Sequence, residues 1–473
     1  MKRRLIVALV LVLSLIFASN SFATLARIQA LGNSDLYFKD IYHIYVNPAY
    51  LGMYTNYVYG ELGNYYYEDG EGLQQQYYQY GQFGGINLKI TNGFNLGLTL
   101  NRGENSNDYY FSWRPVSPWN SNIFYSFPSF HYTYVDYYTY TRWLQWGDFS
   151  SGPEDLIHRF DLMTSYDFDM LHLGISFYNS RDKWTDRSWY PDTASKVTYE
   201  DEGSISTTGL TFGGLINFGE ENKHSAEVMG SIWFDKAKGD FTVDTLSSTT
   251  TNYESEHYKT DGGTGMSIGG RAFLALFEKV DIVPVFGFST EKISMKYTGA
   301  NSARRDTSVK SGDYKENVFF AGCGANWKLE KGMVEGGLAI AQYTVDNKIN
   351  ANNDTLVWQN KSTEKYFPGF NLGVEYGLTK WLDARVGVQE FFGNDRSEGK
   401  QSKQYYSSYN HRWDDEYLFN NYPENFLSFG LGFKFSKFRI DGTIYEKNFF
   451  EGTYLLSGRQ TNVFGTLSAT FEF

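Results

Sequence analysis

The sequence contains little cysteine, little proline and, beyond its first residues, no long apolar segment. One Cys among 473 residues cannot form an internal disulfide, and nine Pro against 47 Gly exclude a collagen-like chain. After residue 23, no apolar run approaches the roughly 18 residues that a transmembrane helix requires. A disulfide scaffold and a bundle of membrane helices are therefore both excluded.

Positive charge is also scarce, and motifs for catalysis are missing. Lys and Arg number 42 against 54 Asp and Glu, which gives a formal net charge of −12. Nucleic acids bind basic faces, so we expect no nucleic-acid partner. The chain has no His-Glu-x-x-His, Cys-x-x-Cys, Walker or Gly-x-Ser-x-Gly motif. We expect a protein that is not an enzyme and holds neither cofactor nor metal.

The first 23 residues have the pattern of a secretory signal peptide. A basic start at Lys2–Arg4 is followed by an apolar stretch at Leu5–Ala18 and by Ser21-Phe22-Ala23, which places small residues at the cleavage positions. The apolar stretch is too short to anchor the chain as a spanning helix. We predict cleavage after Ala23 and export from the cytoplasm.

Most of the remaining chain alternates between apolar and polar residues. Around the hairpin signal Asn92-Gly93, the apolar residues of 86–90 and 94–100 occupy every second position. A period of two indicates β-strands, here joined in antiparallel pairs. The same unit recurs at 160–177, 206–236, 267–290, 316–344, 367–391 and 426–447.

The connections separate a membrane barrel from a secreted β-sandwich array, which would alternate as well. Tight turns fall within each pair, whereas roughly twenty residues or more separate the pairs, as in outer-membrane barrels with short periplasmic turns and long extracellular loops. An opening strand near 53–62 and a closing strand at 463–473 bring the total to about sixteen, with fourteen as the alternative. We therefore predict an all-β, transmembrane antiparallel β-barrel over 53–473.

A barrel in lipid has an apolar outer face and a polar lumen. The alternation places six charged side chains of the last hairpins on the lumen face, where they either pair to fill a closed lumen or line a solute path. These are Glu375, Asp383, Arg385, Lys434, Arg439 and Asp441.

The C-terminal strand alternates down to the last residue. Phe471 and the terminal Phe473 resemble the signal by which bacterial outer-membrane proteins are recognised for insertion. We therefore expect the barrel-assembly machinery and outer-membrane lipid as partners.

The connection at 101–157 is dense in aromatic residues. Tyr and Trp offer rigid contact area for sugars or proteins, but a long loop also needs such residues for a small core of its own. Both readings stay open, and the binding candidates are Trp113, Trp119, Tyr134, Tyr137, Trp143 and Trp146.

The segment after the signal peptide resembles a known family. Ala26-Arg27, Ala30-Leu31-Gly32, Asp40 and Asn47-Pro48-Ala49-Tyr50-Leu51 look like the N-terminal segment of the FadL-like outer-membrane barrels, which include hydrophobic-compound transporters and PorV-like proteins. The resemblance implies a periplasm-proximal hatch over 24–52, with Asn47, Pro48 and Ala49 inside the barrel. From the residues alone, Asn47-Pro48 predicts a tight turn into the first strand.

The resemblance implies an outer-membrane conduit for a small or hydrophobic solute. The alternatives are a PorV-like scaffold that holds a secreted or cell-surface protein through its aromatic loops, or an adhesin.

Overall fold

The computed structural model describes residues 25–32, 36–63, 65–68, 75–78, 83–100, 158–191, 195–247, 251–301, 309–351, 356–401, 411–420, 426–444 and 464–473. Three short helices begin the described chain: α2 (Leu25–Ala30), η1 (Ile41–Tyr45) and η2 (Pro48–Gly52). A single turn, η4 (Glu220–Asn222), joins two strands. Within these ranges, every helix is too short or too polar to cross a membrane.

Nearly everything else that the structure describes is β-strand. The strands are β1 (Tyr57–Gly63), β2 (Tyr65–Glu68), β3 (Gln75–Tyr78), β4 (Phe83–Lys89), β5 (Phe94–Leu100), β6 (His158–Phe168), β7 (Leu171–Pro191), β8 (Ser195–Phe218), β9 (His224–Ser247), β10 (Thr251–Phe277), β11 (Val280–Asn301), β12 (Val309–Leu329), β13 (Gly332–Ala351), β14 (Leu356–Gly377), β15 (Leu382–Gln401), β16 (His411–Asn420), β17 (Phe426–Phe435), β18 (Phe438–Ile444) and β19 (Phe464–Glu472).

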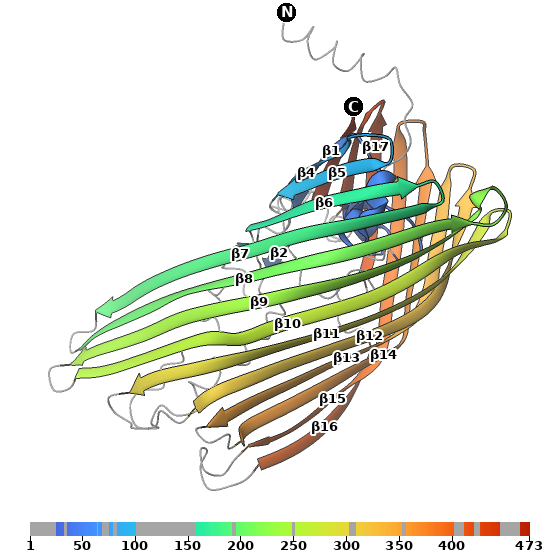
Figure 1. The fold of residues 1–473 in the computed structure, drawn as a ribbon. Helices are drawn as coiled ribbons and strands as arrows, with labels where there is room; N and C mark the ends of the chain where they lie inside the picture. The colour runs from blue at the N-terminus through green and yellow to red at the C-terminus, as the bar shows by residue number, and fades with distance from the viewer. Residues whose placement is uncertain are drawn as a thin grey trace, which may run out of the picture.

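Antiparallel pairing closes these strands into a barrel (Figure 1). β1 pairs with both β4 and β19, so the first and last strands of the barrel meet. β16 and β17 share one position in the wall, because β16 pairs with the second half of β15 and β17 with its first half. The described residues therefore form sixteen wall positions, which confirms the predicted barrel and its strand number.

The tight turns predicted within the strand pairs all lie at one end of the barrel, which we call the turn end. The backbone of these turns adopts positive φ angles at the expected positions. Gly93 has a φ of +91°, and Asp169 and Ser436 each have a φ of 58°. Such left-handed positions favour Gly, Asn and Asp. The chain ends at the same end, where Phe473 N donates to Asn56 O over 3.0 Å.

The connections at the other end differ from the prediction. Strands β7 to β15 are 20 to 27 residues long, about twice the 9 to 11 residues that cross a membrane. Much of what was expected as loop is thus paired strand, and only 192–194 separates β7 from β8. Far from the turn end the sequence of these strands is more polar and loses the regular apolar alternation by which strands are predicted.

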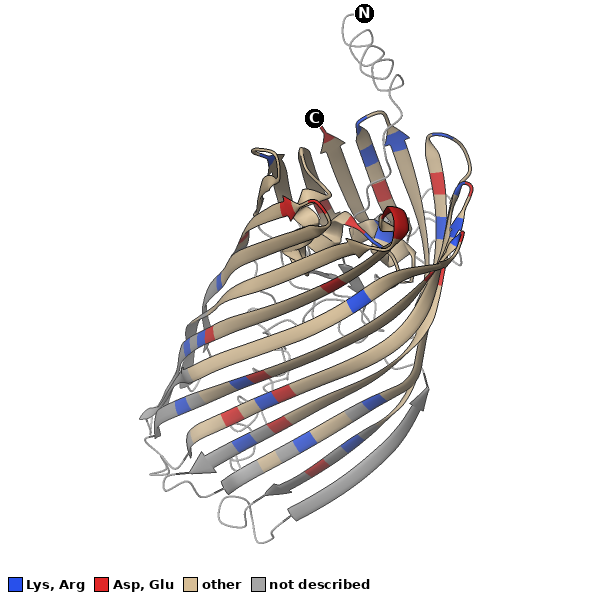
Figure 2. Ribbon diagram, turned by 45° about the vertical axis from the view of Figure 1, so that its right-hand side comes forward, with Lys and Arg blue, Asp and Glu red and all other residues tan. Residues whose placement is uncertain are grey.

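Within the membrane-spanning part, the two faces of the wall differ sharply. On β15, the Val386 side chain faces out with 37% exposure, whereas neighbouring Arg385 faces in with 3%. Exposed apolar residues follow the outer face on most strands, including Leu173, Phe212, Ile232, Phe286 and Leu372. Figure 2 shows the charged residues of the described wall gathered toward its two ends. This is the surface of a transmembrane β-barrel.

We predict that Val386→Arg reduces assembly of the barrel into membranes, whereas Val386→Leu does not. An Arg on the lipid face near the midplane costs about 2 to 4 kcal/mol. Heat-modifiable mobility on gels measures the folded fraction. Equal folding of both variants would contradict the inside-outside assignment of β15.

Candidate functional site

Residues 25–32 and 36–54 form a compact segment inside the barrel near the turn end, which we call the hatch (Figure 1). Helix α2 packs on β15, β17, β18 and β19, and η2 packs on β5, β6, β7 and β8. Apolar hatch residues form a buried core, among them Ile28, Leu31, Phe38, Ile44 and Leu51. The hatch therefore bridges opposite parts of the wall.

The Asn-Pro pair starts one of the hatch helices. Asn47 is the N-cap of η2, and its Oδ1 accepts from Ala49 N over 3.1 Å. Pro48 occupies the first helical position, where a missing N–H costs nothing. Asp40 caps η1 in the same way and exchanges a second bond with His43. The segment thus both turns toward β1 and fills the lumen.

On one side, the hatch is held by a buried carboxylate of β9. Glu227 accepts hydrogen bonds from Asn47 Nδ2 at 3.2 Å and from the Tyr50 hydroxyl at 2.8 Å. Arg271 of β10 pairs with Glu227 at 2.5 Å and donates to the backbone carbonyl of Leu36 at 3.0 Å. One wall carboxylate and one wall guanidinium therefore fix both η2 and the chain before η1.

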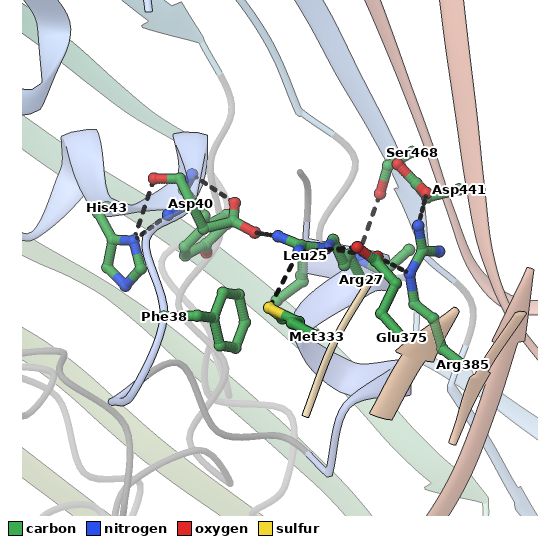
Figure 3. A network of polar contacts seen from close by, with 12 residues as sticks. Leu25, Arg27, Phe38, Asp40, His43, Met333, Glu375, Arg385, Asp441 and Ser468 are labelled. Carbon is green, nitrogen blue, oxygen red and sulfur yellow. Dashed lines mark hydrogen bonds and ion pairs between the residues drawn. The ribbon is translucent and has the colours of Figure 1, made fainter. Parts of the chain in front are cut away.

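On the other side, the hatch contributes a charge of its own (Figure 3). Arg27 of α2 pairs with Glu375 of β14 at 2.7 Å and with Asp40 of the hatch at 3.2 Å. Glu375 also pairs with Arg385 at 2.6 Å, and Arg385 pairs with Asp441 at 2.7 Å. Arg27 thus ties the hatch to a chain of wall charges.

The wall charges continue toward β17 and β18. Arg439 pairs with Asp441 at 2.7 Å and with Asp383 at 3.4 Å, while Lys434 pairs with Asp383 at 2.7 Å. All six lumen residues singled out from the sequence therefore belong to one ion-pair network. Five are buried, and the Lys434 side chain is 29% exposed.

Sequence reasoning missed the hatch member of this network. Three wall carboxylates already match three wall cations, so no charge imbalance pointed to Arg27. The resemblance included Arg27 but assigned it no partner. Its role becomes visible only from the pairing with Glu375.

The two cations of the hatch differ electrostatically. Burial opposes the charge of Arg27, but Glu375 and Asp40 outweigh it and raise the pKa of this guanidinium above its usual value. Burial lowers the pKa of Lys39 to about 8, although its Nζ donates to Ser225 Oγ over 2.7 Å. Arg27 is therefore the permanent hatch cation, whereas Lys39 loses its proton in mildly alkaline solution.

Glycines of the wall provide the room for the hatch backbone. A Cβ at Gly213 of β8 would collide with Asn47 Oδ1, and one at Gly387 of β15 would collide with the backbone of Gly32. The neighbouring Gly214 faces outward, where a Cβ would meet only side-chain atoms at 3.7 Å. Close approach to the hatch, and not wall structure alone, therefore requires glycine at 213 and 387.

The remaining predicted sites lie elsewhere. Phe471 and Phe473 are 44% and 47% exposed on the outside of the turn end, and their role in insertion stays a prediction. The aromatic candidates of 101–157 lie outside the described residues. Within the described part, His, Cys, Asp and Glu nowhere converge in threes as a metal site requires.

These features define a class: a transmembrane β-barrel whose N-terminal segment lies inside the lumen near the turn end. No family model and no curated protein matches the chain. Among solved structures it is similar to the toluene transporter TodX of Pseudomonas putida, with a TM-score of 0.37, 9% identity, and 97% of this chain and 100% of that one covered.

Two further solved structures are similar to a comparable degree. A FadL homologue of Pseudomonas aeruginosa has a TM-score of 0.36 and 11% identity, covering 97% of this chain and 99% of that one. The ferric yersiniabactin uptake receptor FyuA of Yersinia pestis has a TM-score of 0.30 and 9% identity, with 88% and 79% covered. Likenesses of this size define no relationship, so the fold assignment rests on the barrel and hatch themselves.

We predict that Gly213→Ala loosens the hatch, whereas Gly214→Ala leaves it in place. The added methyl at 213 must displace Asn47 and its bond to Glu227, at a cost of roughly 1 to 3 kcal/mol. Hydrogen exchange of residues 36–54 in the folded barrel is the measurement. Unchanged protection in Gly213→Ala would show that the hatch does not seat against β8 as described.

Proposed function

We propose that the chain is an outer-membrane conduit for a small or hydrophobic solute, with the hatch as its gate. In this proposal, outer-membrane lipid contacts the apolar outer face and the barrel-assembly machinery receives the C-terminal strand. A sixteen-strand barrel is wide enough to leave an aqueous channel unless something fills it. The hatch is what fills the turn end.

One observation carries the proposal: the hatch is held to the wall through side chains. Among the described residues, the backbone-to-backbone hydrogen bonds of 25–54 stay within the hatch, and every bond between a hatch backbone group and the wall goes to a wall side chain. Its wall contacts are instead ion pairs, side-chain hydrogen bonds and apolar packing. The hatch can therefore move while the ladder of the barrel stays intact.

In this proposal, Arg27 is the residue that holds the hatch in its closed position. It is buried, and its side chain joins the hatch to Glu375 through two hydrogen bonds at 2.7 and 3.1 Å. Removing one partner of a buried ion pair costs about 3 to 5 kcal/mol. Glu375 keeps Arg385 as a second partner, so loss of Arg27 weakens hatch docking more than it weakens the wall.

We predict that Arg27→Met raises the conductance of the barrel in planar bilayers by ~10-fold or more, because it releases part of the docking energy. Lys434→Met is the matched control, since Lys434 pairs with Asp383 of the same network without touching the hatch. The control should conduct like the unmodified protein. Hydrogen exchange reports whether Arg27→Met frees the hatch. If the hatch is free and the barrel still passes neither ions nor hydrophobic solutes, the conduit proposal is wrong.

A second function is favoured by the length of the strands. Because β7 to β15 continue well past the apolar band, they form ribbons that offer a large surface outside the membrane. A PorV-like scaffold or an adhesin would use such a surface to hold a secreted or cell-surface partner.

Purification from native membranes tests the scaffold alternative. We predict for a scaffold that a stoichiometric partner accompanies the barrel and is lost when residues 239–259 are replaced by a short turn, while the barrel still folds. A lone barrel in mild detergent would contradict the scaffold and leave the conduit.

A further inference from the structure

A buried carboxylate of β1 lies against the first described residues of the hatch. Glu61 is 4% exposed, and its Oε1 accepts a hydrogen bond from Leu25 N at 3.0 Å. Its Oε2 accepts from the hydroxyl of Ser468 on β19, and the same Ser468 oxygen accepts from Ala26 N at 3.2 Å. The start of α2 is thus held against this one carboxylate.

Glu61 has no positive partner among the described residues. Its two hydrogen-bond donors are a backbone amide and a hydroxyl, which are both neutral, and the strongest charge effects on it come from Asp441 and Asp40, which are also acidic. A buried carboxylate is costly without a counter-charge. The neighbouring ion-pair network is already matched, with four cations against four carboxylates: Arg27, Arg385, Arg439 and Lys434 against Asp40, Glu375, Asp383 and Asp441.

Covalent geometry brings one particular amine to Glu61. The predicted cleavage after Ala23 makes Thr24 the first residue of the mature chain. Water then hydrolyses the Ala23–Thr24 peptide bond, so the leader leaves with a carboxylate and Thr24 gains an α-ammonium group. Bond lengths keep the nitrogen atoms of adjacent residues within about 3.7 Å of each other. Because Leu25 N already donates to Glu61, rotation within Thr24 is enough to bring its ammonium to the same carboxylate.

We propose that the α-ammonium group of Thr24, released when the leader is removed, docks on Glu61 and completes the hatch. An α-amino group is largely protonated at neutral pH, so it supplies the missing positive charge. A chain that keeps its leader has a neutral amide at residue 24 and leaves Glu61 without a counter-charge. Docking of the hatch is thereby coupled to processing of the chain. This inference rests on the predicted cleavage and holds whether or not the barrel conducts, so it goes beyond the gate function.

Acetylation of the α-amine measures whether the ammonium is docked. The barrel is purified from outer membranes in detergent and treated with acetic anhydride at neutral pH, and mass spectrometry quantifies the acetylated N-terminal peptide. We expect Thr24 to react at least ~10-fold more slowly in the folded barrel than in the same protein unfolded by heating in dodecyl sulfate, because a buried ammonium must leave its counter-ion before it reacts.

Two substitutions show whether Glu61 is responsible. Glu61→Gln removes the charged acceptor and should restore most of the reactivity of the amine. The matched control is Glu221→Gln, which removes an exposed carboxylate of the 219–223 turn and should leave the amine as protected as in the unmodified protein.

A further variant moves the amine and leaves the carboxylate in place, which keeps the test decisive if Glu61→Gln does not fold. Insertion of Gly-Gly after Ala23 retains the predicted cleavage residues and displaces the amine by about 7 Å of extended chain. The displaced amine should react severalfold faster than the amine of the unmodified barrel.

Three results would overturn the proposal. Equally fast acetylation of the folded and the unfolded protein would mean that Glu61 is protonated and holds only Leu25 and Ser468. Protection that survives both in folded Glu61→Gln and after the insertion would mean that another group shields the amine. N-terminal sequencing that finds a first residue other than Thr24 would remove the ammonium from this position. Because reactivity is measured in detergent, a barrel that is silent in bilayers leaves these results unaffected.

Discussion

A charge buried between the hatch and the wall must find its counter-charge there, because water is excluded from these side chains. The pairing of Arg27 with Glu375 meets this constraint and links the N-terminal segment to strands formed several hundred residues later. Arg385, Asp441, Arg439, Asp383 and Lys434 extend the same chain of alternating charge. Docking of the hatch and the arrangement of the charged side chains on β14 to β18 therefore depend on one another.

On its opposite side, the hatch is held by hydrogen bonds to the wall and by close packing of backbones. Glu227 and Arg271 satisfy side chains and backbone groups of the hatch at once, and glycine at 213 lets Asn47 approach the wall. Such contacts are specific in position yet none belongs to the strand ladder. A plug with these properties is compatible with a gate, and the projecting ribbons are compatible with a scaffold. A gate would act at the turn end of the barrel, whereas a scaffold would hold its partner at the opposite end.

The barrel wall was predictable because membrane-spanning strands expose one face to lipid and one to the lumen. Alternation at 367–391 and 426–447 sufficed to place Arg385 and Asp441 inside and Val386 outside. The same logic failed beyond the membrane. There the sequences of β7 to β15 are rich in polar residues and lose the apolar alternation, so paired strands look like loops, and the connections were predicted far too long.

Local chemistry in the sequence thus defined the strands, their inside and outside faces, and the helix start at Asn47-Pro48, because each of these depends on neighbours close in the chain. Closure of the barrel decided the rest. Arg27 and Glu375 are 348 residues apart. Which charged groups meet depends on register around the whole wall, and no local pattern encodes that register.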